Sequence, residues 1–231
     1  MRPSFSLSCE PPLLVLRFDE PVETLGWPVV KPGFSSAREI VWLEVRNKDL
    51  PLHVDPVLLL KEKLAARRLD EAAAFMTSRD PRRHHVAQYC IGDVSATCVA
   101  TVGLSNAERV GGRRLAEGRE AFGTINTFVH VSAPLAPAAF IEAVSIATEA
   151  RTAAIMEVNP PNDGLPFTGT GTDCIIVAAP KGGRPASCGG LHTDVGEAIG
   201  TAVYETILAG ATEWIAETAP ISAHQRTQGA R

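Results

Sequence analysis

The chain has 231 residues, a formal net charge of −4 at pH 7 and a hydrophobic content of 45%. This length and composition suffice for one large domain with a substantial core. The slightly acidic balance excludes a basic surface of the kind that follows a phosphate backbone, so nucleic acid is not an expected partner.

Neither export nor membrane insertion is expected. Residues 1–3 lead directly into polar residues without a long apolar run. The longest uncharged segment, 121–141, contains Asn126, His130 and two prolines, which makes it a poor membrane span. The five cysteines are odd in number and form no Cys-x-x-Cys pair, so neither a disulfide framework nor a zinc ribbon is expected. These features predict a cytoplasmic protein.

The first half of the chain is predicted to form short strands and one helix. A hairpin is expected at 4–18, where alternating apolar and polar residues surround a Pro-Pro turn. Asp55 followed by Pro56 indicates a helix start, because Asp caps the first turn and Pro at the first position sacrifices no hydrogen bond. The expected buried stripe of this helix is Val57, Leu60, Leu64 and Leu69. Further strands are predicted at 27–30, 40–45, 86–89 and 94–102.

The second half combines strands with two long helices. One strand is predicted at 125–131 and a short apolar one at 174–178. The first long helix begins at Pro137, and the second runs from about Thr193, its expected N-cap, to about Ala216. The fold class is therefore α/β or α+β, with a layered, mixed or largely antiparallel sheet packed against two or three long helices.

The segment Thr168–Asp173 alternates threonine with glycine before an apolar strand. Backbone N–H groups and hydroxyls in such a turn bind an anion or an oxyanion. The alternative is a tight loop whose two glycines need positive φ. The spacing of the residues alone does not decide between these two interpretations.

A second glycine turn precedes the last helix and carries His192 just before the helix N-terminus. The partial positive charge there favours a negatively charged group or transition state. In the alternative interpretation His192 packs against the helix or caps it. Asp194 and Glu197 in the first turn need no function, because acidic residues there favour the helix dipole.

Two asparagines and one glutamate are further candidates. Asn106 lies in a loop between strands, and such loops carry function more often than cores do. Asn126 in an apolar strand either bonds to neighbouring backbone or faces a ligand, because an unpaired buried amide is costly. Glu149 faces inward on the first long helix or forms a surface salt bridge.

Standard catalytic signatures are absent from the sequence, which contains no Gly-x-Ser-x-Gly elbow, P-loop, His-Glu-x-x-His or Rossmann glycine trio. The pair His84-His85 follows two arginines and is expected to form an exposed polar patch. No metal is expected, because helix-spaced histidine pairs and cysteine clusters are missing.

Taken in order and spacing, four segments resemble the adenosylcobinamide amidohydrolase family. They are Gly123-Thr124-Ile125-Asn126, residues 147–154, Thr168–Asp173, and the stretch from His192 to Tyr204. The resemblance covers about residues 35–215. Arg38-Glu39 stand where a more glycine-rich stretch is expected after 35–37, so that loop is left out of the site.

The resemblance implies hydrolysis of the amide that links aminopropanol to the corrin side chain of adenosylcobinamide. The products are adenosylcobyric acid and 1-amino-2-propanol, which returns salvaged corrinoid to cobalamin synthesis. The corrinoid is substrate, so no cofactor is expected. The implied domain covers 1–219, followed by a polar, disordered tail at 220–231.

Amide hydrolysis requires an activated water or nucleophile, an oxyanion donor and an acid for the leaving amine. The catalytic candidates are His192, Asp173, Thr172 and Glu197. The substrate-binding candidates are Asn106, Asn126, Thr170, Gly171 and Glu149. We expect the Thr168–Asp173 loop and the His192–Glu197 helix start to converge on one pocket.

Three rival functions stay open from the sequence. They are a non-catalytic protein that binds or delivers corrinoids, an amidohydrolase of another amide, and an interaction module whose glycine loops are only turns. Homo-oligomer formation, the catalytic nucleophile and the preferred upper ligand of the corrinoid are likewise open.

Overall fold

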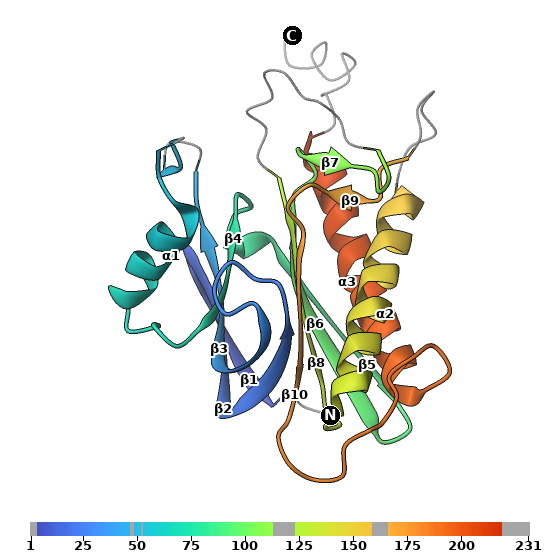
Figure 1. Cartoon of the computed structure of the whole chain (residues 1–231). Helices are drawn as coiled ribbons and strands as arrows, with labels where there is room; N and C mark the ends of the chain where they lie inside the picture. Colours follow the sequence, from blue (N-terminus) through green and yellow to red (C-terminus); the bar gives the residue numbers. More distant parts are fainter. Residues whose placement is uncertain (1–3, 47–48, 52, 113–122, 159–165, 219–231) are drawn as a thin grey trace, which may run out of the picture.

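The computed structural model has a mixed α/β architecture, in which an eight-stranded mixed sheet packs against three helices (Figure 1). It describes residues 4–46, 49–51, 53–112, 123–158, 166–218. The predicted fold class is therefore confirmed. The expected tail at 220–231 lies outside the described residues.

The order of strands in the large sheet is β4-β3-β2-β10-β8-β6-β5, with β1 paired to the first part of β2. All neighbours are antiparallel except the pairs β3/β4 and β8/β10. A separate ribbon pairs β7 with β9. The strands are β1 Phe5–Glu10, β2 Leu13–Gly26, β3 Gly33–Glu44, β4 Ala73–Thr77, β5 His84–Ile91, β6 Val94–Val102, β7 Ala107–Glu108, β8 Ile125–Val131, β9 Gly169–Thr170 and β10 Cys174–Ala179.

The described part of the chain contains three α-helices and the short 3-10 turn η2, and α3 follows the last strand. They are α1 Pro56–Ala65, the turn η2 Pro81–Arg83, α2 Pro137–Val158 and α3 Asp194–Thr218. The Asp55 side chain accepts from the Val57 and Leu58 amides, as the Asp-Pro start predicts. Thr193 caps α3, because its hydroxyl accepts from the Gly196 amide at 3.0 Å.

Alternate residues of each strand enter different cores, because successive side chains point to opposite faces. In β3, Ile40 and Trp42 enter an inner core, whereas Val41 and Leu43 pack with α1. In β8, Phe128 enters the same inner core while Val129 packs toward α2 and α3. The sheet thus curves around its own core and is covered outside by α1 on one side and by α2 and α3 on the other (Figure 1).

The curvature brings the edge strand β4 against the inner strands β8 and β6. Strands β4 and β5 are the edge strands, and only residues 78–83 connect them. The Asn126 side chain on β8 donates to the Met76 carbonyl on β4 at 2.7 Å, and the Thr101 and Thr77 hydroxyls lie 3.4 Å apart. A register shift between Arg17 and Val22 marks an irregularity in the long β2–β3 pair, where a sheet bends.

Most predicted elements are confirmed, but several differ, among them the short strands β7 and β9, which were not predicted. The strand predicted at 27–30 is wrong, because Pro28 has no amide hydrogen and only an isolated bridge joins Val30 to Ala74. Strand β4 was not predicted, since its alanine-rich run has little strand propensity and is held by distant β3. In α1, Leu60 and Leu64 are buried as predicted, but Val57 is exposed.

None of the described helices is long and apolar enough to cross a bilayer. Within the described ranges, no cluster of three or more His, Cys, Asp or Glu side chains could hold a metal ion.

Candidate active site

A cavity of about 250 Å³ opens where several strands begin or end at one end of the curved sheet. Strands β3 and β4 end beside it, and β8 and β10 begin there. The lining residues are Val29, Val45, Arg46, Leu50, Met76, Thr77, Ser78, Asn106, Gly123, Thr124, Thr172 and Cys174. The curvature of the sheet therefore creates the cavity, because it brings segments far apart in sequence to one place.

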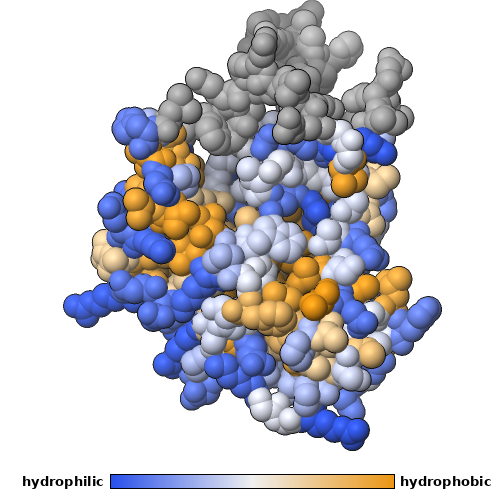
Figure 2. Space-filling view, viewed as in Figure 1, coloured by the Kyte–Doolittle hydropathy of each residue, from blue (hydrophilic) through white to orange (hydrophobic). Residues whose placement is uncertain are grey.

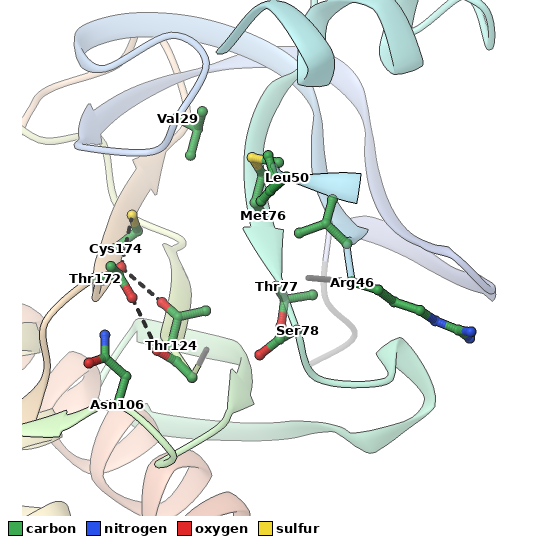
Figure 3. Close-up of a pocket in the computed structure, with 12 residues that line it drawn as sticks. Val29, Arg46, Leu50, Met76, Thr77, Ser78, Asn106, Thr124, Thr172 and Cys174 are labelled. Atoms are coloured by element: carbon green, nitrogen blue, oxygen red, sulfur yellow. Dashed lines mark hydrogen bonds between the residues drawn. The ribbon is translucent and has the colours of Figure 1, made fainter. Parts of the chain in front are cut away.

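The two sides of the cavity differ in polarity. Val29, Leu50 and Met76 lie on one side, while Asn106 and Thr124 lie on the other (Figure 3). The molecular surface has the same division, being largely apolar over α1 and largely hydrophilic over β7 and β9 (Figure 2). The cavity is thus suited to a ligand with one apolar and one hydrogen-bonding side.

Asn106 presents its side-chain amide to the cavity from the start of the β7–β9 ribbon. Its backbone carbonyl accepts from the Gly171 amide at 3.2 Å. A Cβ atom on Gly171 would lie 3.2 Å from the Asn106 side-chain nitrogen, so the glycine leaves room for this amide. No other residue in the described part of the chain engages the side-chain amide, which is free to bind a ligand.

Thr124 and Thr172 join the starts of β8 and β10. The Thr124 hydroxyl donates to the Thr172 carbonyl at 2.8 Å, and the Thr172 hydroxyl donates to the Gly123 carbonyl at 3.1 Å (Figure 3). Cys174 follows in the cavity wall, where burial and the neighbouring Asp173 raise the pKa of its thiol to about 11. The thiol is therefore protonated near neutral pH and is a poor nucleophile.

The Asp173 side chain makes four contacts that hold the loop behind this wall. Its carboxylate contacts the Arg151 guanidinium and the Thr170 hydroxyl, and it accepts from the amides of Ile125 at 3.1 Å and Thr170 at 3.0 Å. Burial raises the pKa of the Asp173 carboxyl, while Arg151 and the hydrogen-bond donors counter this shift. The carboxylate is engaged on both oxygens, so it holds the loop in place rather than abstracting a proton.

Gly169 is required by this arrangement. A Cβ atom at this position would collide with both the Arg151 guanidinium and the Asp173 carboxylate. The Thr-Gly alternation of 168–172 therefore serves close approach, because neither Gly169 nor Gly171 has the positive φ that the turn interpretation requires.

Glu108 follows Asn106 by two residues at the end of strand β7, and both side chains lie close to Gly171. The Cγ atom of Glu108 would lie 3.7 Å from a Cβ atom on Gly171, next to the Asn106 amide. Its Oε2 is buried without a hydrogen-bond partner in the described part of the chain. A buried, unpaired carboxylate oxygen is rare and is a frequent sign of a functional group.

The structure does not bring His192 and Asp173 together within one chain. Asp173 precedes β10 and His192 follows the loop at its other end, and six extended residues span about 20 Å (Figure 1). The Gly189 amide donates to Glu142 in the second turn of α2, whereas Asp173 contacts Arg151 nearer the other end of that helix.

Most of the remaining predicted site residues also lie outside the cavity. His192, Glu197 and Glu149 are exposed, and Glu149 accepts a hydrogen bond from Ser145 in its own helix. Asn126 is buried and bonded to backbone, as its structural interpretation predicts. Only Asn106 and Thr172 among the predicted site residues line the cavity, with Thr170, Gly171 and Asp173 in the loop behind it.

Several residues of the site were not predicted from the sequence. Met76 and Thr77 end the unpredicted strand β4, although the apolar run 72–76 is a signal for a short buried strand. Thr124 and Arg151 lie inside recognised motifs, but their partners are distant in sequence. Glu108 carries no local signal, because its burial depends on the β7–β9 pairing.

The sequence model of one protein family, described as adenosylcobinamide amidohydrolase, matches residues 2–219. The uncharacterised protein MJ1613 of Methanocaldococcus jannaschii is 37% identical over 93 residues, which cover 39% of this chain and 36% of that protein. The match thus spans little more than a third of this relative.

Two solved structures are similar at low sequence identity. A β-aminopeptidase of Burkholderia sp. has a TM-score of 0.44 at 11% identity, covering 88% of this chain and 78% of the other. The PH0078 protein of Pyrococcus horikoshii OT3 has a TM-score of 0.46 at 11% identity, covering 90% and 82% of the two chains.

Proposed function

Because the chain belongs to the adenosylcobinamide amidohydrolase family, whose members are hydrolases of amide C–N bonds, we propose that it hydrolyses adenosylcobinamide. The bond cut is the amide between aminopropanol and the corrin side chain, and the products are adenosylcobyric acid and 1-amino-2-propanol. The observation that carries this proposal is the family match over 2–219, and the proposed domain covers 1–219.

The cavity supports the proposal with groups suited to an amide. The Asn106 amide is a free donor for the scissile carbonyl oxygen, on which negative charge develops during attack. Fixed donors of this kind stabilise the tetrahedral intermediate more than the ground state. We therefore place the scissile carbonyl beside Asn106.

Glu108, which lies beside Asn106 but does not itself line the cavity, is the proposed general base. Its carboxylate takes a proton from a water molecule as the water oxygen bonds to the carbonyl carbon. The same proton then passes to the departing amine nitrogen as the C–N bond breaks, so the step balances as amide plus water to acid plus amine. Glu108 suits this task because no described residue engages its buried oxygen.

Thr172 and Asp173 have supporting parts in this proposal. The Thr172 hydroxyl donates to the Gly123 carbonyl, and no described base lies within hydrogen-bond reach of it, which favours water over Thr172 as the nucleophile. Asp173 and Arg151 position the loop that carries Thr170, Gly171 and Thr172.

The test is incubation of the purified full chain with adenosylcobinamide, with both products quantified by mass spectrometry. Equal amounts of adenosylcobyric acid and 1-amino-2-propanol, formed above a heat-inactivated control, support the proposal. Tight binding without amine release would instead indicate a corrinoid-binding protein, and turnover only of other amides would indicate a different amidohydrolase.

A further inference from the structure

We infer that the cavity binds only the aminopropanol-bearing arm of the substrate, that the corrin ring stays outside, and that the apolar wall selects the methyl group of the amino alcohol. This inference rests on the proposed function, which it refines by naming the part of the substrate that is recognised.

Size is the first reason. The cavity measures about 250 Å³, whereas sites that enclose a drug-sized ligand measure about 300–1,000 Å³. A corrin macrocycle with its peripheral side chains is larger than a drug-sized ligand, so this cavity cannot enclose it. The arm is a short chain that ends in a secondary amide and a three-carbon amino alcohol, and a cavity of this size holds it.

Polarity is the second reason. The carbon next to the terminal methyl of 1-amino-2-propanol also carries a hydroxyl, so this end of the arm has one apolar and one polar side. Val29, Leu50 and Met76 form one wall of the cavity, opposite Asn106 and Thr124 (Figure 3). With the amide beside Asn106, the methyl group faces the apolar wall.

Two residues of the apolar wall come from separate elements. Met76 is the penultimate residue of β4, and Val29 lies in the segment after β2 that bridges to β4 through Val30. Both side chains are half-buried, so a longer side chain at either position extends into the cavity.

The first measurement compares two substrates with the unmodified protein. Replacing the aminopropanol of adenosylcobinamide by aminoethanol removes one methyl group, and a hydrophobic site discriminates such a loss by roughly 10- to 200-fold. We expect kcat/KM to fall by at least about tenfold. Equal kcat/KM values for the two substrates would overturn the selection of the methyl group.

The second measurement uses a matched pair of variants, Val29→Phe and Val86→Phe. Val86 is 50% exposed on the edge strand β5 and does not line the cavity, so the same change there is the control. We expect Val29→Phe to lower kcat/KM by roughly 10²-fold and Val86→Phe to leave it unchanged, with both melting temperatures measured. Equal activity of the two folded variants would overturn the inference.

The third measurement is independent of turnover and of variant folding. The probe is N-(2-hydroxypropyl)propanamide, which reproduces the arm without the ring, and its binding to the unmodified protein is followed by ligand-observed NMR. Binding supports the arm as occupant, and absence of binding at millimolar probe overturns it.

The two proposals fail in different ways. If adenosylcobinamide is hydrolysed but the probe neither binds nor competes, the proposed function stands and the inference on the cavity is wrong. If the probe binds but adenosylcobinamide is not hydrolysed, the proposed function is wrong, and the cavity binds a hydroxypropyl amide that belongs to another compound.

Discussion

The guanidinium of Arg151 on α2 contacts the carboxylate of Asp173 immediately before β10, and their side chains are only 12% and 8% exposed. The pair ties the loop 168–173 to a helix 22 residues earlier in the chain. Removing one partner of such a buried pair leaves an uncompensated charge, which is more costly than the pair itself is favourable.

We expect Arg151→Met to lower the free energy of unfolding by about 3–5 kcal/mol, measured by urea titration. Arg17→Met is the control, because the Arg17 side chain is 56% exposed, and an ion pair that reaches solvent in this way is worth at most about 1 kcal/mol. Without Arg151 the pKa of Asp173 should rise further, because only the hydrogen bonds from Thr170 and Ile125 then oppose the effect of burial.

This change also predicts a pH dependence. An acid whose folded pKa lies above its unfolded pKa stabilises the protein at low pH, and the contribution is lost as pH rises through the folded pKa. The stability deficit of Arg151→Met should therefore be larger at about pH 8 than at about pH 5. A deficit that does not depend on pH would mean that Asp173 keeps its charge through other partners.

Asn106 and Thr172 should differ in their effect on turnover. Asn106→Ala removes the proposed oxyanion donor and should lower kcat by roughly 10²- to 10³-fold. Thr172→Val removes only the hydrogen bond to the Gly123 carbonyl and should lower kcat by less than about tenfold. Steady-state kinetics decides the matter, since abolition of turnover in Thr172→Val would identify Thr172 as a nucleophile.

Glu108→Gln should separate catalysis from stability. As the general base, Glu108 should contribute roughly 10²-fold or more to kcat. The melting temperature should stay the same or rise, because the substitution removes a buried unpaired charge. The exposed Glu205→Gln on α3 is the control, and a parallel loss of activity in both variants would argue against a specific role.

His192→Ala should retain activity, because His192 is exposed and lies at the far end of β10 from the cavity. We expect kcat/KM within about twofold of the unmodified protein, since exposed side chains away from the site contribute little to transition-state binding. A large loss with unchanged melting temperature would place His192 in a site that this chain forms with another copy.

His130 should make the protein sensitive to acid. It is 6% exposed among the rings of Phe5 and Phe18, and burial lowers its pKa to about 4. Between the unfolded value of 6.5 and about 4, the unfolded chain binds the extra proton, so stability falls as pH falls. The slope should approach about 1.4 kcal/mol per pH unit.

His130→Gln tests this expectation by urea titration across that pH range. The variant should lose the acid-dependent part of the slope, and the exposed His192→Gln should keep it. Asp19 and Glu20 border the same cavity as His130. Both residues are present in both variants, so they cannot account for a difference between the two slopes. Identical slopes in the two variants would assign the acid sensitivity to other groups.

The local elements could be predicted where the chain carries its own signals. Asp55-Pro56 starts α1 and Thr193 caps α3, because capping depends on residues three or fewer positions apart. The strand predicted at 125–131 was found with the same limits, since its apolar run is uninterrupted. The segment at 27–30 failed as a strand for an equally local reason, the missing amide hydrogen of Pro28.

Sequence alone determined the fold class, most element positions and the resemblance to the family. It also indicated Asn106 and the Thr168–Asp173 loop as candidate site residues, because polar residues at strand ends and an alternation of Thr and Gly can be recognised in the sequence itself. Only the tertiary structure decided which candidates meet. The curvature of the sheet places Met76 and Val29 opposite Asn106, and the direction of β10 separates His192 from Asp173. Such proximities depend on strand pairing between residues tens of positions apart, which no local pattern encodes.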